Sequence, residues 1–115
     1  RLAPVLAGGN TAVVVASEPH PRAAIELAEV LATSDVPGGV VNLLTGHRDE
    51  LASVLAGHMD VNALDLGDAD GQVEELERLA ADSVKRVVRG APEVQSPWEI
   101  AAFLELKTVW HPIGV

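Results

Sequence analysis

The sequence predicts an α/β fold in which a mainly parallel sheet lies between layers of helices, a three-layer arrangement. Three observations carry this prediction. Short β-branched runs recur along the chain, and amphipathic helical segments separate them. Turns rich in glycine or proline connect the runs to the helical segments. Strands joined through a helix lie parallel with a right-handed crossover, and 115 residues leave room for one core.

The first unit is expected to be a strand, a helix and a second strand. A short apolar helix ends at Gly8 to Asn10, and the run 11–16 that follows is almost continuously β-branched, as in a strand covered on both faces. A helix is expected over 21–33, because its apolar residues fall three and four apart. The expected strands are 12–16, 40–44, 61–66 and 84–89, with a last strand near 106–110.

Three more helices are expected between and after these strands. The first covers 48–56, and its acidic first turn suits the helix dipole. The second covers 72–83, with Asp68 or Asp70 as its N-cap. The third runs over 96–106 and opens with serine, proline and a glutamate at capping spacing.

Composition excludes several partners and chemistries. Seventeen acidic residues against eight basic ones give a net charge of −9, so nucleic acid and anionic membranes are poor partners. The chain has no cysteine, which removes thiol nucleophiles, disulfides and thiolate metal sites, and is consistent with a cytoplasmic location. No apolar run is long enough to span a bilayer, and the four histidines show no metal-ligand spacing.

Three segments together resemble a known family. They are APVLAGGNT at 3–11, ASE at 16–18 and VPGGVVNLLTG at 36–46, and their order and spacing are similar to the coenzyme-binding domain of the NAD(P)-dependent aldehyde dehydrogenase superfamily. The resemblance implies a Rossmann-like, eroded coenzyme-binding domain over 1–95. It also implies that the helix and strand of 96–115 are a possible oligomerisation segment.

Glu18 is the one candidate for coenzyme binding. The resemblance implies that this position, with a lysine three residues earlier, holds the adenosine ribose, but Val15 stands in the lysine's place. The structural alternative, a polar residue at the end of a strand, is favoured about two to one, because one acid alone makes a weak site.

The loop 67–71 departs furthest from the family. Where the family places a glycine-serine-threonine turn that receives the pyrophosphate, this chain has Asp68 and Asp70, which would repel a dianion. The same acids, with Gly71 and Glu77, partly match a calcium-binding EF-hand loop, but Leu66 fills its first ligand position. We therefore expect no metal site.

The catalytic groups of the family have no counterpart that we would transfer. Gly90 takes the position of the general base, and Glu93 is three residues out of place beside a proline. With no cysteine nucleophile either, we expect no catalytic residue in this chain.

The leading hypothesis is therefore a non-catalytic aldehyde-dehydrogenase-like domain without bound cofactor. Such a domain would serve folding, assembly or regulation, through self-association or through a larger dehydrogenase chain. The alternative is the NAD- or NADP-binding part of a functional dehydrogenase whose catalytic domain lies elsewhere. A third possibility is that these residues are an excerpt of a longer enzyme, because the sequence opens within a helix.

Overall fold

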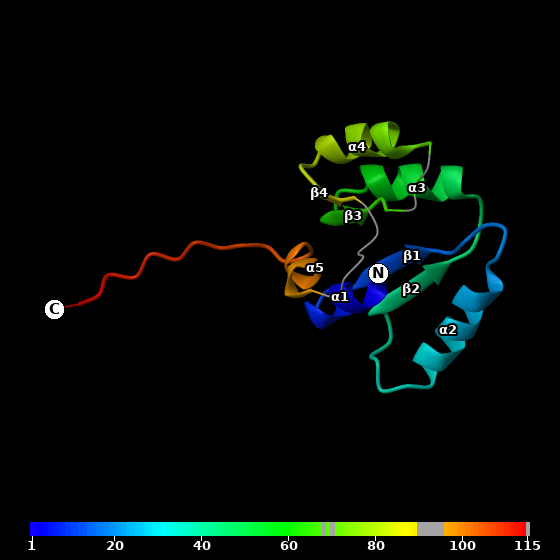
Figure 1. Cartoon of the computed structure of the whole chain (residues 1–115), viewed down its shortest axis with the longest axis horizontal. Helices are drawn as coiled ribbons and strands as arrows, with labels where there is room; N and C mark the ends of the chain where they lie inside the picture. Colours follow the sequence, from blue (N-terminus) through cyan, green and yellow to red (C-terminus); the bar gives the residue numbers. More distant parts are fainter. Residues whose placement is uncertain (68, 70, 90–95, 115) are drawn as a thin grey trace.

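The computed structural model describes residues 1–67, 69, 71–89 and 96–114, and it has alternating helices and short strands (Figure 1). The elements are α1 (Leu2–Ala7), β1 (Ala12–Val15), α2 (Arg22–Ala32), β2 (Val41–Leu44), α3 (Arg48–Gly57), β3 (Ala63–Asp65), α4 (Val73–Ala81), β4 (Arg86–Val88) and α5 (Pro97–Ala101). Among the helices of these described segments, none has both the length and the hydropathy needed to cross a membrane.

The strands pair in parallel, but they form two sheets. β1 pairs with β2 from Ala12 opposite Val41 to Val15 opposite Leu44, and β3 pairs with β4 from Ala63 opposite Arg86 to Asp65 opposite Val88. The α/β class and the parallel pairing are as predicted. The prediction of a single sheet is wrong, because β1 and β3 are not hydrogen-bonded to each other. Sequence periodicity identifies strands, whereas which edges meet is decided by packing between distant elements.

The prediction of a last strand near 106–110 is wrong. Those residues follow α5 as an extended segment without strand pairing. Figure 1 shows why, since this red C-terminal segment runs away from both sheets and so lies beside no strand edge. The helix expected over 96–106 ends at Ala101, although Ser96 caps it as predicted by accepting a hydrogen bond from the Trp98 amide.

The described core lies under α3 and α4, which pack side by side over β3 and β4 (Figure 1). Its buried residues are Ala56 on α3, Leu66 directly after β3, and Leu76 on α4. The first sheet is less well covered, because Val13 on β1 keeps 46% of its surface exposed. The expectation that this strand is covered on both faces therefore fails in the isolated chain.

The turn from α4 into β4 contains a strained residue. The Lys85 amide donates to the Ala80 carbonyl and the Val84 amide to the Ala81 carbonyl, the two bonds of a Schellman helix end. Val84 takes the left-handed position of this motif at φ +53°, where glycine is usual and a β-branched residue is strained. The fold keeps it because the neighbouring Lys85 side chain is buried and donates to the His58 carbonyl.

Val84→Gly should therefore stabilise the protein, by about 1 kcal/mol once the greater freedom of glycine in the unfolded chain is subtracted. Val54 is a matched control, because it is 65% exposed on α3 with helical geometry. Val54→Gly should cost a few tenths of a kcal/mol. Urea unfolding measures both changes, and a loss of stability in both variants would contradict the assigned strain.

Candidate functional site

The carboxyl ends of β1 and β2 bring one acid beside the start of α3. Glu18 follows β1, and its carboxylate lies against the two residues that open α3. One oxygen is 3.0 Å from Nδ1 of His47, and the other accepts the backbone N–H of Arg48 at 3.1 Å. Parallel pairing causes this arrangement, because loops that leave the same end of adjacent strands are neighbours.

The contact makes Glu18 a capping group for α3. The first N–H groups of a helix lack partners within the helix, and His47, the residue at the N-cap position, supplies no side-chain cap itself. Hydrogen bonding from the Arg48 amide, and then from His47, lowers the pKa of Glu18. The anion is therefore the favoured form, and the positive end of the helix reinforces it.

This role confirms neither ribose binding nor its absence, but it defines what a ribose would meet. Each carboxylate oxygen already has one partner, so a hydroxyl would have to use the remaining lone pairs of a group half exposed to water. Val15, in the lysine's place, lies on β1 and offers no donor. The structural interpretation of Glu18, favoured from the sequence, thus has specific contacts.

The start of α4 is acidic and internally bonded. The Asp68 and Asp70 positions lie outside the described residues, but the N-cap position of α4 is Gln72, so the expectation that one of those acids occupies it is wrong. The Gln72 side-chain amide donates to Asp49 on α3 at 2.8 Å, joining the starts of the two helices. Glu74 and Glu75 then fill the first turn of α4.

Other sequence candidates do not assemble into a site. Gly90 and Glu93 also lie outside the described residues. Trp98 and Trp110 are 81% and 90% exposed, so neither forms part of a cage. Within the ranges that the structure describes, no three histidine or acidic side chains are grouped to hold a metal ion.

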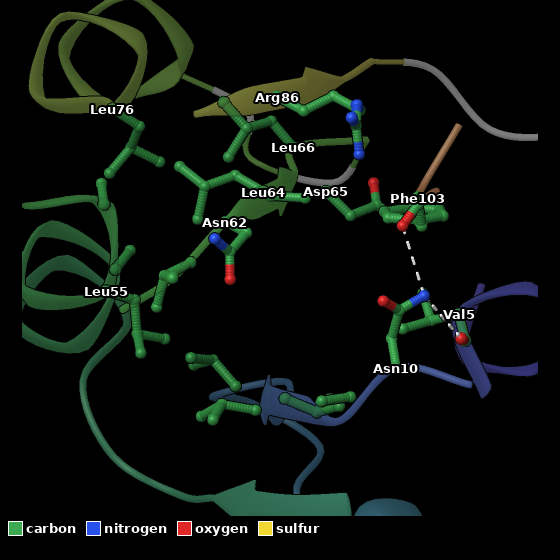
Figure 2. A pocket seen from close by; sticks show the side chains of 18 of the residues that line it. Val5, Asn10, Leu55, Asn62, Leu64, Asp65, Leu66, Leu76, Arg86 and Phe103 are labelled. Atoms are coloured by element: carbon green, nitrogen blue, oxygen red, sulfur yellow. Dashed lines mark hydrogen bonds between the residues drawn. The ribbon is translucent and has the colours of Figure 1, made fainter. Parts of the chain in front are cut away.

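An open cleft separates the two sheets. It has a volume of about 1250 Å³, and its walls include β1, β3, one face of α3 and Leu76 of α4. Figure 2 shows Leu55, Leu64, Leu66 and Leu76 on one side, with Asn10 across the opening. The Asn10 amide donates to the carbonyls of Val5 at 3.1 Å and Phe103 at 3.3 Å, which ties the residues after α5 to α1 at the rim of the cleft.

Comparison with known protein families gives a match over most of the chain. The family model described as "Aldehyde dehydrogenase family" matches residues 1–89. The chain belongs to the aldehyde dehydrogenase family. The resemblance inferred from the three sequence segments is thereby confirmed.

Relatives from three organisms support this membership. The chain is 35% identical over 88 residues to the NADP/NAD-dependent aldehyde dehydrogenase PuuC of Escherichia coli K12, covering 76% of the chain and 18% of that protein. It is 33% identical over 86 residues to a hydroxyisobutyraldehyde dehydrogenase of Mycolicibacterium austroafricanum, covering 75% and 17%. A mitochondrial aldehyde dehydrogenase of Leishmania tarentolae is 32% identical over 83 residues, covering 72% and 17%.

The chain spans less than a fifth of the length of those three relatives. No solved structure matches the chain significantly. The family match ends at residue 89, so the division of the chain at residue 95 stays a prediction.

Sequence reasoning missed the partners of Glu18. The sequence analysis weighs the four histidines only as metal ligands and residue 48 only as the start of a helix. The signal was available, because parallel strands near 12–16 and 40–44 place the loops after them at one edge of the sheet.

The Glu18 contact predicts a specific dependence of stability on pH. Because its pKa is lowered in the folded state, its contribution is complete above the ordinary pKa of about 4.3 and is lost as the pH falls through the folded value. Glu18→Gln should be less stable than wild type at pH 7, and this gap should close below about pH 4.

Glu26→Gln is the matched control, since it removes an exposed carboxylate from α2, outside the contact. Urea unfolding at a series of pH values measures the gap for each variant. A Glu18→Gln gap that is constant across the acidic range would show that the carboxylate charge does not support α3.

Proposed function

We propose that this chain is a non-catalytic aldehyde-dehydrogenase-like domain that serves the assembly or regulation of a larger enzyme. One observation carries the proposal: Glu18, the acid that the family resemblance assigns to the coenzyme ribose, caps α3 through His47 and Arg48 instead. A group that stabilises its own fold has less to offer a ligand, because any new partner must share or displace the existing one.

The chemistry of the remaining positions supports the same proposal. The 115 residues contain no cysteine to attack an aldehyde, and glycine stands at the aligned position of the general base. The phosphate-binding turn of the family is acidic here, and α4 begins with further acids at Glu74 and Glu75. Pyrophosphate would meet like charges instead of free amide hydrogens.

We place this domain in the cytoplasm with its partner enzyme. The absence of cysteine from a chain of this length fits a reducing compartment, and the net charge of −9 disfavours anionic surfaces.

Turnover by the isolated chain tests the proposal. Purified protein mixed with an aldehyde and NAD or NADP should produce no more reduced coenzyme than the same mixture without protein, because no nucleophile is present. A complete aldehyde dehydrogenase provides the positive control in parallel. Sustained production of NADH or NADPH by this chain alone would overturn the proposal.

A second function is favoured by a separate observation. The unit of β1, α2 and β2 keeps the parallel pairing of a mononucleotide-binding half, and the relative PuuC is named for its use of NADP or NAD. The chain would then contribute a nucleotide site to a functional dehydrogenase whose catalytic part lies elsewhere. Glu18 would bind the ribose with its remaining lone pairs.

Titration calorimetry with NAD and NADP separates the two functions. The assembly proposal predicts no saturable heat at micromolar coenzyme with either the wild type or Glu18→Ala. Micromolar binding by the wild type that disappears in Glu18→Ala, but persists in the control Glu26→Ala, would establish the nucleotide-binding function instead.

A further inference from the structure

The cleft between the two sheets has an apolar end and a polar end. Leu55 of α3, Leu64 of β3 and Leu76 of α4 are among the residues that line it. Figure 2 shows these leucines toward one end, whereas Asn10 and the guanidinium of Arg86 lie at the other. Such a cleft suits a ligand with an apolar body and one polar head.

Apolar side chains of the cleft walls are open to water. Val13 on β1 is 46% exposed and Met59, which follows α3, is 83% exposed, and both line the cleft. The volume of about 1250 Å³ exceeds the roughly 300–1,000 Å³ of most small-molecule sites, so space does not limit the length of a ligand. Each methylene group that enters the cleft and leaves water adds to the affinity, which favours a hydrocarbon chain.

The polar end has an arginine with unused donors. Arg86 is half-buried on β4, and its backbone N–H donates to the Asn62 carbonyl. Its guanidinium has no ion-pair partner among the described side chains, whereas three other arginines each pair with an acid. A guanidinium offers five N–H donors and no acceptor, and arginine is rarely buried without a partner. A ligand that supplies acceptor atoms would satisfy it.

The acids that line the cleft do not meet this need. Asp65 lies at the same end of the cleft (Figure 2), but Arg1 engages both of its carboxylate oxygens. One of these oxygens also accepts the Gly67 N–H at 3.0 Å. The other two acids of the lining, Asp60 and Glu105, are exposed to water, which weakens their charge interactions. The polar end therefore lacks one negative charge with two acceptor oxygens.

We propose that the cleft binds a long-chain carboxylate. The carboxylate accepts two parallel hydrogen bonds from the Arg86 guanidinium, and the hydrocarbon chain lies along Leu55, Leu64 and Leu76. A monoanion suits the site better than a phosphate-headed amphiphile, because one arginine is available and the chain carries a net charge of −9. This inference goes beyond the proposed function, since it gives the domain a ligand of its own.

Calorimetry with decanoate, decanol and octanoate tests the site, at pH 7 and about 0.15 M salt. Decanoate should bind saturably at one site per chain. Decanol has the same hydrocarbon chain without the charge, so it should bind at least tenfold more weakly. Octanoate lacks two methylenes and should bind up to about fifteenfold more weakly than decanoate, since each buried methylene contributes up to about fourfold.

Substitutions locate the two ends of the ligand. Arg86→Gln should lower decanoate affinity at least tenfold and leave decanol binding unchanged, which also shows that the variant is folded. Arg86→Lys keeps the charge without the planar fork, and its decanoate affinity should lie between those of Arg86→Gln and wild type. Leu55→Gln should weaken the binding of both decanoate and decanol, because it places a polar group against the hydrocarbon chain.

Arg22→Gln is the matched control. It removes an exposed arginine from α2, outside the cleft lining, and changes the net charge by the same amount as Arg86→Gln. Its affinity for decanoate should equal that of the wild type.

Three results would overturn the carboxylate site. The first is no saturable heat with decanoate, whether the cleft stays empty or a second copy of the chain fills it. The second is equal affinity for decanoate and decanol, and the third is decanoate binding that survives Arg86→Gln. None of these measurements involves coenzyme or aldehyde, so failure here leaves the non-catalytic function standing. Conversely, turnover by the chain would refute that function without affecting the carboxylate site.

Discussion

The parallel pairing of β1 with β2 is the constraint on which the candidate site depends. It places the loop after β1 beside the start of α3, so the Glu18 carboxylate meets the Arg48 amide and the His47 ring. At the end of the sheet where related folds bind nucleotides, the Glu18 carboxylate caps a helix of its own chain. The start of α4 is also engaged within the chain, because the Gln72 side-chain amide donates to Asp49 on α3.

A second feature of the fold is that its strands form two separate pairs and not one continuous sheet. The pairs β1–β2 and β3–β4 each satisfy one edge, and the apolar cleft lies where the other edges of β1 and β3 are open. Among the described residues, helices α3 and α4 pack closely enough over the β3–β4 half to bury Ala56, Leu66 and Leu76. The extended C-terminal tail has the opposite problem, because it has apolar side chains and no surface to cover them.

The sequence allowed the elements and the family to be predicted, because both are encoded locally. The valine run of β1 and the apolar stripe of α2 are within one or two residues of the observed bounds, and the three motif segments identified the family. Three features of the structure could not be predicted from the local sequence. The gap between the sheets, the unpaired tail and the left-handed Val84 all depend on how distant elements pack. The pairing of Glu18 with Arg48 lies between these cases, since strand order predicts the proximity of the two loops but not which atoms meet.

The central claim is that groups which would hold a coenzyme are replaced or already engaged within the protein. The most direct measurement is the backbone amide spectrum of the intact chain during titration with NAD, followed at Arg48 and at the residues of the loop 67–71. Our account predicts that these resonances stay in place, because the Arg48 amide remains bonded to Glu18 and the acidic loop rejects phosphate. Saturable shifts at both positions would contradict it, since they would mean that the coenzyme displaces the helix cap and lies against the loop.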